Sequence, residues 1–453
     1  MTVIVIPKNY YVYVAVFIGH IGAFIAALSM TWSSPILSKL SSLEDNPLGR
    51  IITSTEQSIL GSIPTIGTFI GTFSSSYLAG KFGRKPVMIG LGVPTIICYV
   101  LMTLSTYIWE LYLARILGGI TLGGIFTVNT MYFAEVAENS NRGLLGTAMI
   151  CFVNFGLLFV LILGPLSTYF WFHVVLSIFP AVFMILVYIF LPESPYYLIL
   201  IDPERAEASL KKLRGSSDVE NELNAIKNSL QKNNQIYLKD LLSKKGLRKG
   251  LFIGCGLILF QQLSGTAVIM SYGQLIFAEA NEGISSEMGP IIIAGLQFLV
   301  GFITPLFIDR TGRIILLLIS YVGMTLAHMT FGLYFFMKDS GGNVSAISWL
   351  PLASLVAYII TYSIGSGPIP WSLIGEIFPL EVKGVATSVC IVVLNICAFV
   401  LIVSFNSMKD FFGLGQTFWI FGTSCIIAAI FSKFYIIETK GKSLMEIQTL
   451  LDA

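Results

Sequence analysis

The chain repeats the same polar motifs at half of its length. Gly83-Arg84-Lys85 follows the second long apolar segment, and Gly312-Arg313 follows the eighth, 229 residues later (312 − 83) in a chain of 453 residues. The repeat continues with two pairs of charged residues and two acidic motifs: Glu135 and Arg142, Glu376 and Lys383, Pro192-Glu193-Ser194-Pro195 and Glu438-Thr439-Lys440-Gly441. Two homologous helical bundles that face each other produce such a repeat, which is the design of an alternating-access transporter. The sequence therefore predicts a carrier.

The composition is that of a membrane protein. Hydrophobic residues make up 55% and charged residues 11% of the chain, whereas a soluble protein has about 25% charged residues. The net charge of +2 gives no indication of a nucleic-acid partner. All six cysteines lie inside apolar segments, without paired spacing or a histidine cluster, so we expect free thiols and no metal site.

Twelve apolar segments are long enough to span a bilayer, which takes about 20 residues. They lie at 10–31, 55–79, 87–106, 110–132, 144–163, 171–191, 250–277, 289–308, 314–337, 348–375, 385–405 and 414–437. The first has no small-residue cleavage site, so we expect a retained span rather than a signal peptide. The prediction is an all-α integral membrane protein with two six-helix bundles at 1–191 and 250–437, a linker at 192–249 and a tail at 438–453.

Lysine and arginine are distributed unequally between the two sides of the predicted membrane protein. Twenty-two of the 27 lie in one set of loops, which includes both termini and the linker, and four lie in the other set. By the positive-inside rule, both termini and the linker face the cytosol. The only Asn-x-Ser/Thr sequon, Asn343-Val344-Ser345, falls in a loop on the outer side, where glycosylation is expected.

The linker is expected to be helical. Pro203-Glu204-Arg205 starts a helix, with proline in the first turn. Six apolar residues then recur at near-helical spacing, at Leu210, Leu213, Val219, Leu223, Ile226 and Leu230. These helices are too polar to span a membrane and are expected at its cytosolic face. A disordered linker is the alternative that the charge content leaves open.

Seven motifs in order resemble the sugar porter family of the major facilitator superfamily over essentially the whole chain. They are Lys81 to Lys85, Glu135 to Gly143, Pro192 to Pro195, Gln261 to Gly265, Asp309 to Arg313, Gly365 to Trp371, and Glu438 to Leu444. Within this family, the exit of the first span at Met30 to Pro35 and the Gly-Ser-Gly-Pro version of the tenth span are most similar to the insect facilitated trehalose transporter-like group. The resemblance implies two bundles that rock about a central sugar site.

Charged residues at the cytosolic span ends are expected to form a latch that closes the inner gate. Ion pairs between neighbouring helices, when partly desolvated, bias a two-state equilibrium more than they add stability. The alternative, ordinary positive-inside anchoring, explains the cations but not the matched carboxylates. The predicted latch residues are Gly83, Arg84, Lys85, Glu135, Arg142, Glu193, Asp309, Arg310, Gly312, Arg313, Glu376, Lys383 and Glu438.

The tenth span is expected to bend or break. Gly365, Gly367, Pro368 and Pro370 remove side chains and backbone donors from consecutive turns. A breakable helix that leads into Trp371 is expected to act as a gate, and a static proline kink is the alternative.

Uncharged amides at bilayer depth are the candidate sugar ligands. A sugar hydroxyl both gives and accepts hydrogen bonds, as an amide does. The candidates are Gln261, Gln262, Gln297 and Asn395, and Trp371 is expected to supply an apolar face for the sugar ring. Hydrogen bonding between helices is the alternative role for any single amide.

Several positions depart from the family pattern. The usual fifth-span Gln is Ile150, the usual seventh-span Asn is Ala267, and the tenth-span Glu of many hexose carriers is Ser363. Gln297 replaces the eighth-span Asn, and Gly80 replaces an acidic or amide residue in the first cytosolic motif. Each lost partner weakens sugar binding by about 1 kcal/mol or more. The identity of the sugar is therefore open.

The first span is expected to lack the group that couples transport to protons. Proton-driven members of the family carry a carboxylate there, but Leu28 occupies that position and no Asp or Glu lies between Tyr10 and Met30. Without a titratable group in the pathway, a proton cannot move in step with sugar. His20 is the one other titratable candidate in this span, and a structural role is expected for it.

The sequence therefore predicts a facilitative uniporter of the plasma membrane that moves a hexose or trehalose as a monomer, without a cofactor. Metal-ligand spacing, a phosphate-binding glycine loop and a catalytic nucleophile are all missing from the sequence, so an enzyme is not expected. A non-transporting sugar sensor, motivated by Ile150, Ala267 and Ser363, and a proton-coupled symporter are the alternatives. A channel is disfavoured by the half-length repeat.

Overall fold

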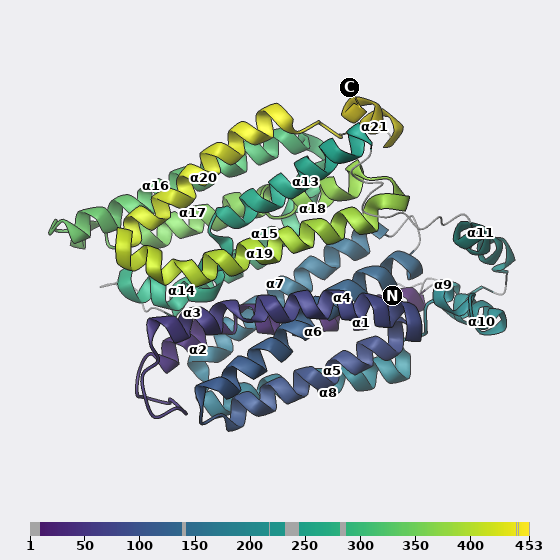
Figure 1. Ribbon diagram of the computed structural model, residues 1–453, viewed down its shortest axis with the longest axis horizontal. Helices are drawn as coiled ribbons and strands as arrows, with labels where there is room; N and C mark the ends of the chain where they lie inside the picture. The colour runs from purple at the N-terminus through teal and green to yellow at the C-terminus, as the bar shows by residue number, and fades with distance from the viewer. Residues whose placement is uncertain are drawn as a thin grey trace, which may run out of the picture. The chain divides into compact units, whose positions relative to one another are not determined.

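The computed structural model describes residues 10–137, 142–216, 218–231, 244–280, 287–440, 442 and 444–452. Within these ranges, the side chains of 142–147, 229–231, 280, 304–310, 380, 381, 444, 445 and 452 lie outside the description. All regular structure among the described residues is helical (Figure 1). The predicted all-helical class is therefore confirmed.

The chain divides into two compact units. Unit 1 comprises Met1–Met30, Pro47–Gly49 and Ile66–Asn233, and unit 2 comprises Thr31–Asn46, Arg50–Thr65 and Asn234–Ala453. The end of the first predicted span and the start of the second thus belong with the carboxyl-terminal half of the chain. Hydrophobic spacing could not reveal this assignment, because both segments are apolar whichever unit they pack against.

Unit 1 is built from nine helices in the described residues. They are α1 (Tyr10–Thr31), α4 (Pro64–Phe82), α5 (Arg84–Leu104), α6 (Ile108–Val136), α7 (Arg142–Leu166), α8 (Tyr169–Phe190), α9 (Pro195–Leu198), α10 (Pro203–Arg214) and α11 (Glu220–Gln231). The last residue of α1 and the first two of α4 fall in unit 2.

Unit 2 contains the remaining described helices and one 3₁₀ turn. They are α2 (Ser33–Leu40), α3 (Ser54–Ser62), α13 (Lys245–Leu263), α14 (Thr266–Ala280), α15 (Met288–Thr311), α16 (Arg313–Asp339), η1 (Ser345–Ile347), α17 (Leu350–Ile364), α18 (Ile369–Ile377), α19 (Leu380–Phe412), α20 (Leu414–Tyr435) and α21 (Leu444–Asp452).

The helices account for all twelve predicted spans. Ten segments of the described chain are long and apolar enough to cross a membrane. Of the other two predicted spans, 289–308 corresponds to α15, in which Met288–Ile303 is a shorter apolar stretch. The span predicted at 55–79 is α3 and α4, which are separated at Ile63, and their many Ser, Thr and Gly residues lower its hydropathy.

The predicted linker helices form a small apolar core beside unit 1's spans. Asp202 caps α10 by accepting a hydrogen bond from the Arg205 backbone N–H, and Pro203 occupies the first turn, as the sequence predicted. The buried residues of this core are Leu198, Ile199, Ala206, Leu210, Val219, Leu223 and Ile226. Over α10 and α11 the linker is therefore helical and not disordered. Leu230 has no described side chain, and residues 232–243 lie outside the description.

Small residues let α4 and α6 pack at backbone distance. A Cβ atom at Gly67 would stand 2.2 Å from the Ile116 carbonyl oxygen, and one at Gly71 would stand 2.1 Å from that of Ile120. Helix association in lipid depends on such close approach, because lipid tails are as apolar as the side chains between helices.

We predict that Gly71→Ala destabilises the protein. The added methyl group must push α4 away from α6, and overpacking of this kind costs about 1–3 kcal/mol. Gly80→Ala is the matched control, because it lies on the same helix with nothing within 4 Å of a Cβ atom. Thermal unfolding of the two detergent-purified variants should separate them, and equal melting temperatures would contradict the packing account.

Candidate substrate site and gating contacts

Glu193 binds the start of α5 in unit 1. Gly83 makes the turn between α4 and α5 at φ 100°, a conformation that other residues rarely adopt. The Glu193 carboxylate accepts hydrogen bonds from the backbone N–H groups of Arg84 (2.9 Å) and Lys85 (3.2 Å). A Cβ atom at Gly83 would stand 2.3 Å from Glu193 Oε2. Glycine is therefore needed both for the turn and for the approach of the carboxylate.

Arg84 joins α5 to α6 through a largely buried ion pair. Its Nη2 lies 2.5 Å from Glu135 Oε1, and the two side chains are 12% and 15% exposed. Arg84 Nη1 also donates to the Ala79 carbonyl on α4. Lys85 donates from Nζ to the Tyr188 carbonyl near the end of α8. Four helix ends are thus joined around one motif.

Unit 2 repeats this arrangement. Gly312 makes the turn between α15 and α16 at φ 96°, and Glu438 accepts from the backbone N–H groups of Arg313 (3.0 Å) and Ile314 (3.1 Å). Arg313 Nη2 lies 3.0 Å from Glu376 Oε1. Glu376 also accepts a hydrogen bond from the Thr439 hydroxyl.

The two capping carboxylates differ in their electrostatics. Burial raises the pKa of Glu193, although backbone N–H groups of Ser194, Arg84 and Lys85 oppose the shift. At Glu438, burial also acts to raise the pKa, but three backbone N–H donors and the Arg313 charge outweigh it and leave the pKa below its ordinary value. The carboxylate of unit 1 is therefore the more easily protonated of the two.

The remaining predicted latch residues are Lys383, Arg142, Asp309 and Arg310. Lys383 donates from Nζ to the Gly375 carbonyl at 3.0 Å, which joins α19 to α18. The side chains of Arg142, Asp309 and Arg310 lie outside the described residues.

The tenth span breaks where its glycines and prolines are concentrated. α17 ends at Ile364 and α18 begins at Ile369, so the break falls on Gly365, Gly367 and Pro368, while Pro370 lies in the first turn of α18. The Ser366 N–H donates to Ser320 Oγ on α16 at 3.0 Å.

Gln261 supplies partners for the carbonyls that this break exposes. Its Nε2 donates to the Ser366 carbonyl at 2.7 Å and to the Gly367 carbonyl at 2.9 Å, and the residue is 3% exposed. An amide nitrogen carries two hydrogens, so both are used. In this conformation Gln261 therefore forms hydrogen bonds between helices. This is the alternative role that was left open for each predicted sugar ligand.

The seventh span is also broken, a feature that its apolar pattern does not predict. α13 ends at Leu263 and α14 begins at Thr266, with Gly265 at φ 85°. His328 on α16 lies with Nε2 2.9 Å from the Ser264 carbonyl, and because a carbonyl only accepts, Nε2 carries the proton. The Tyr358 hydroxyl contacts Thr266 Oγ1 at 2.7 Å. Gly265 in the Gln-Gln-Leu-Ser-Gly motif was the signal for this break.

The other predicted sugar ligands lie on four helices of unit 2. Gln262 on α13 and Asn395 on α19 are buried, and Asn395 Nδ2 donates to the Ile391 carbonyl of its own helix. Gln297 lies on α15 and is partly buried. Trp371 on α18 is 40% exposed. A common sugar site for these residues stays a prediction.

Polar contacts also join α2 and α3 to α14 and α19 within unit 2. Asn406 Nδ2 donates to Ser58 Oγ and to the Ser54 carbonyl, each at 3.1 Å. Ser34 Oγ accepts from the Gln274 backbone N–H at 3.1 Å. These interhelical hydrogen bonds are called the outer contacts below. The sequence did not predict them, because serine and asparagine in a span commonly bond their own helix.

A cavity of about 190 Å³ lies beside the outer contacts. Its lining includes Gln57, Tyr272, Glu279, Asn406 and Lys409. Glu279 and Lys409 form an ion pair at 2.7 Å.

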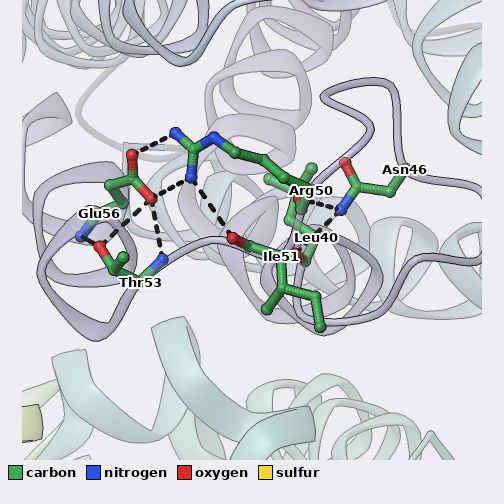
Figure 2. Close-up of polar contacts among 6 residues, drawn as sticks. All are labelled: Leu40, Asn46, Arg50, Ile51, Thr53 and Glu56. Carbon is green, nitrogen blue, oxygen red and sulfur yellow. Dashed lines mark hydrogen bonds and ion pairs between the residues drawn. The ribbon is translucent and has the colours of Figure 1, made fainter.

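The loop between α2 and α3 is extensively hydrogen-bonded, as Figure 2 shows. Arg50 forms a two-pronged ion pair with Glu56, and Glu56 forms a capping box with Thr53 at the start of α3. Asn46 Nδ2 donates to the carbonyls of Leu40 and Arg50. These bonds fix the ends of α2 and α3 relative to each other.

The predicted glycosylation site is exposed. Asn343 precedes η1, and its side-chain oxygen accepts from the Ser345 hydroxyl at 2.6 Å. Modification of Asn343 stays a prediction.

Comparisons with known proteins cover nearly the whole chain. A family described as sugar (and other) transporter matches residues 2–451. A protein of Culex quinquefasciatus named facilitated trehalose transporter is 34% identical over 434 residues, which are 94% of this chain and 83% of the relative. A relative of the same name from Aedes aegypti is 33% identical over 94% of this chain but only 53% of its own length.

Solved structures share the fold. The inward-open conformation of the E. coli xylose transporter XylE has a TM-score of 0.81 at 23% identity, over 97% of this chain and 99% of that chain. A partially occluded inward-open form also has a TM-score of 0.81, over 96% of this chain. The predicted all-helical transporter fold is thereby confirmed. From the extent of the family match and the identity of its relatives, this chain belongs to the sugar (and other) transporter family.

Proposed function

We propose that this protein is a facilitative carrier that moves a hexose or trehalose across the plasma membrane by alternating access, with both termini in the cytosol. The observation that carries the proposal is the pair of helix breaks in unit 2 that Gln261 joins. One break ends α13 two residues after Gln261, and the carbonyls at the other break accept hydrogen bonds from its amide. Broken helices at membrane depth are tolerated where they line a site or a cavity. The names of the relatives support a sugar as substrate, and trehalose in particular.

Two sets of contacts are candidates for the gates. The latch around Arg84 and Arg313 repeats in the two units at the ends predicted to face the cytosol. The outer contacts lie at the other ends of the spans. A carrier alternates between two closures, and polar contacts at the two ends of the spans can bias the equilibrium between them.

Uniport is the form of transport that the first span supports. Near the end of the first span, the Ser29 carbonyl accepts a hydrogen bond of 2.8 Å from Nη1 of the buried Arg115 on α6. The first span itself contains no carboxylate. A proton-binding group that could respond to sugar is therefore missing where proton-driven members carry it. A proton-coupled symporter remains the alternative mode.

A sugar sensor is the second candidate function. Both amide hydrogens of Gln261 are donated to backbone carbonyls, which leaves fewer groups for a sugar than the family pattern implies. A protein that binds sugar without moving it would tolerate such a site.

Uptake of labelled glucose and of labelled trehalose into oocytes tests the proposal. We expect saturable uptake of one of them, unchanged by an inward proton gradient, because the first span lacks a carboxylate. Water-injected oocytes are the control, with surface expression measured in parallel. Accumulation driven by a pH gradient would overturn uniport, and no uptake by protein at the surface would favour the sensor.

Substitution of the two adjacent glutamines should separate their roles. Gln261→Leu leaves two carbonyls at the helix break without their donor, at about 1–3 kcal/mol for each, and we expect a lower maximal rate. Gln262→Leu should instead raise KM, because Gln262 is the other predicted sugar ligand on the same helix and does not donate to the break. Measurement of KM and of the maximal rate for both variants tests these two roles. A raised KM with an unchanged maximal rate in Gln261→Leu would assign that residue to sugar binding.

Neutralising Glu135 should impair transport far more than neutralising an exposed glutamate. Breaking one partner of a buried pair costs about 3–5 kcal/mol, so Glu135→Gln is expected to reduce uptake per surface molecule by about tenfold or more. Glu207→Gln is the matched control, since its pair with Lys211 at 2.7 Å is exposed. Similar uptake by the two variants would contradict a role of the latch in transport.

A further inference from the structure

Two thiols face each other where α13 packs against α19. The sulfur atoms of Cys255 and Cys390 lie 3.9 Å apart, and all six cysteines are free. Among the described residues, no other two cysteine sulfurs share a hydrogen bond. The proposed carrier mechanism gives this pair no role.

A glycine next to the pair brings the helices together. A Cβ atom at Gly254 would stand 3.3 Å from Cys390 Sγ and 3.3 Å from Ile374 Cγ1, so α13 presents bare backbone to its neighbours here. A disulfide needs sulfur atoms about 2.05 Å apart, so the side chains must rotate toward each other from the observed 3.9 Å for the bond to form.

The two cysteines lie at similar depth. Cys255 is six residues after Lys249 on α13, and Cys390 is seven residues after Lys383 on α19, which places them about 9 and 10 Å along their helices from these cations. By the predicted topology this is the cytosolic half of the bundle.

One thiol of the pair is accessible and the other is buried. Cys390 is buried, whereas Cys255 is partly exposed. Cys255 also precedes Gln262 by seven residues, or two helical turns, so both lie on one face of α13. Since Cys255 is the more exposed thiol, an oxidant would reach it before Cys390.

We propose that Cys255 and Cys390 form a redox-sensitive dithiol, which hydrogen peroxide converts into a disulfide that slows transport. Peroxide oxidises the Cys255 thiol to a sulfenic acid and is itself reduced to one water. The Cys390 sulfur then attacks the sulfenic sulfur, so that the S–S bond forms, the S–O bond breaks, and the oxygen leaves as a second water with the Cys390 proton. In the reducing cytosol the resting state is the dithiol, and the disulfide is transient.

The cross-link joins two helices that carry the predicted transport machinery. α13 continues to Gln261 and the break at Gly265, and α19 carries Asn395 and, further along, Asn406 of the outer contacts. Any sliding of α13 against α19 during the cycle stretches the bond. The slowing of transport rests on the proposed function, whereas formation of the disulfide does not.

The test is peroxide treatment of the full-length protein in proteoliposomes, followed by alkylation and mass spectrometry without reduction. We expect a peptide that links Cys255 to Cys390, two hydrogen atoms lighter than the dithiol, which dithiothreitol reverses. Cys255→Ser and Cys390→Ser should abolish it. Cys397→Ser is the matched control on α19 and should keep it.

Sugar flux in the same proteoliposomes supplies the second readout. Flux should fall with peroxide and recover with dithiothreitol in the wild type and in Cys397→Ser, but stay unchanged by peroxide in Cys255→Ser. Absence of the linked peptide, or sulfinic acid at both residues, would overturn the dithiol. A linked peptide with undiminished flux would overturn the effect on transport. Absence of any flux in untreated wild-type protein would count against the proposed carrier and leave the disulfide to be judged by its peptide.

Discussion

The structure depends on the need to give every backbone polar group a partner where water is absent. Helices satisfy this need by themselves, but a chain that must bend at membrane depth exposes carbonyl and N–H groups. Gln261, His328 and Ser320 supply the missing partners at the two breaks of unit 2. Each of these three residues lies on a different span from the break to which it bonds. The breaks are thus held by the surrounding bundle rather than by the broken helices.

The same requirement explains the repeated motif at the span ends. A helix that begins directly after a tight turn leaves its first N–H groups without partners, and a carboxylate at that point satisfies two of them at once. Glu193 and Glu438 do this in the two units, each beside a glycine turn and an arginine paired with a second glutamate. One ancestral solution, duplicated, accounts for motifs that lie 229 residues apart (312 − 83).

The sequence predicted those features that depend on residues close together along the chain. The length and position of the spans follow from apolar runs, and the break at Gly365 to Pro368 follows from residues that cannot continue a helix. The break at Gly265 was missed, because the apolar pattern of the seventh span continues through it and a single glycine in a span is common. The outer contacts of Asn406, Ser58 and Ser34 were missed as well, since only the packing of α2 and α3 onto α14 and α19 brings these side chains together.

Counterflow in proteoliposomes tests the central claim most directly. Vesicles loaded with unlabelled trehalose or glucose are diluted into a trace of the labelled sugar, and the label inside is followed with time. An alternating-access carrier predicts a transient accumulation of label above its outside concentration, because inward movement of label is coupled to the outward return of the loaded site. Equilibration without an overshoot would indicate a channel, and no entry of label would indicate a protein that does not transport these sugars.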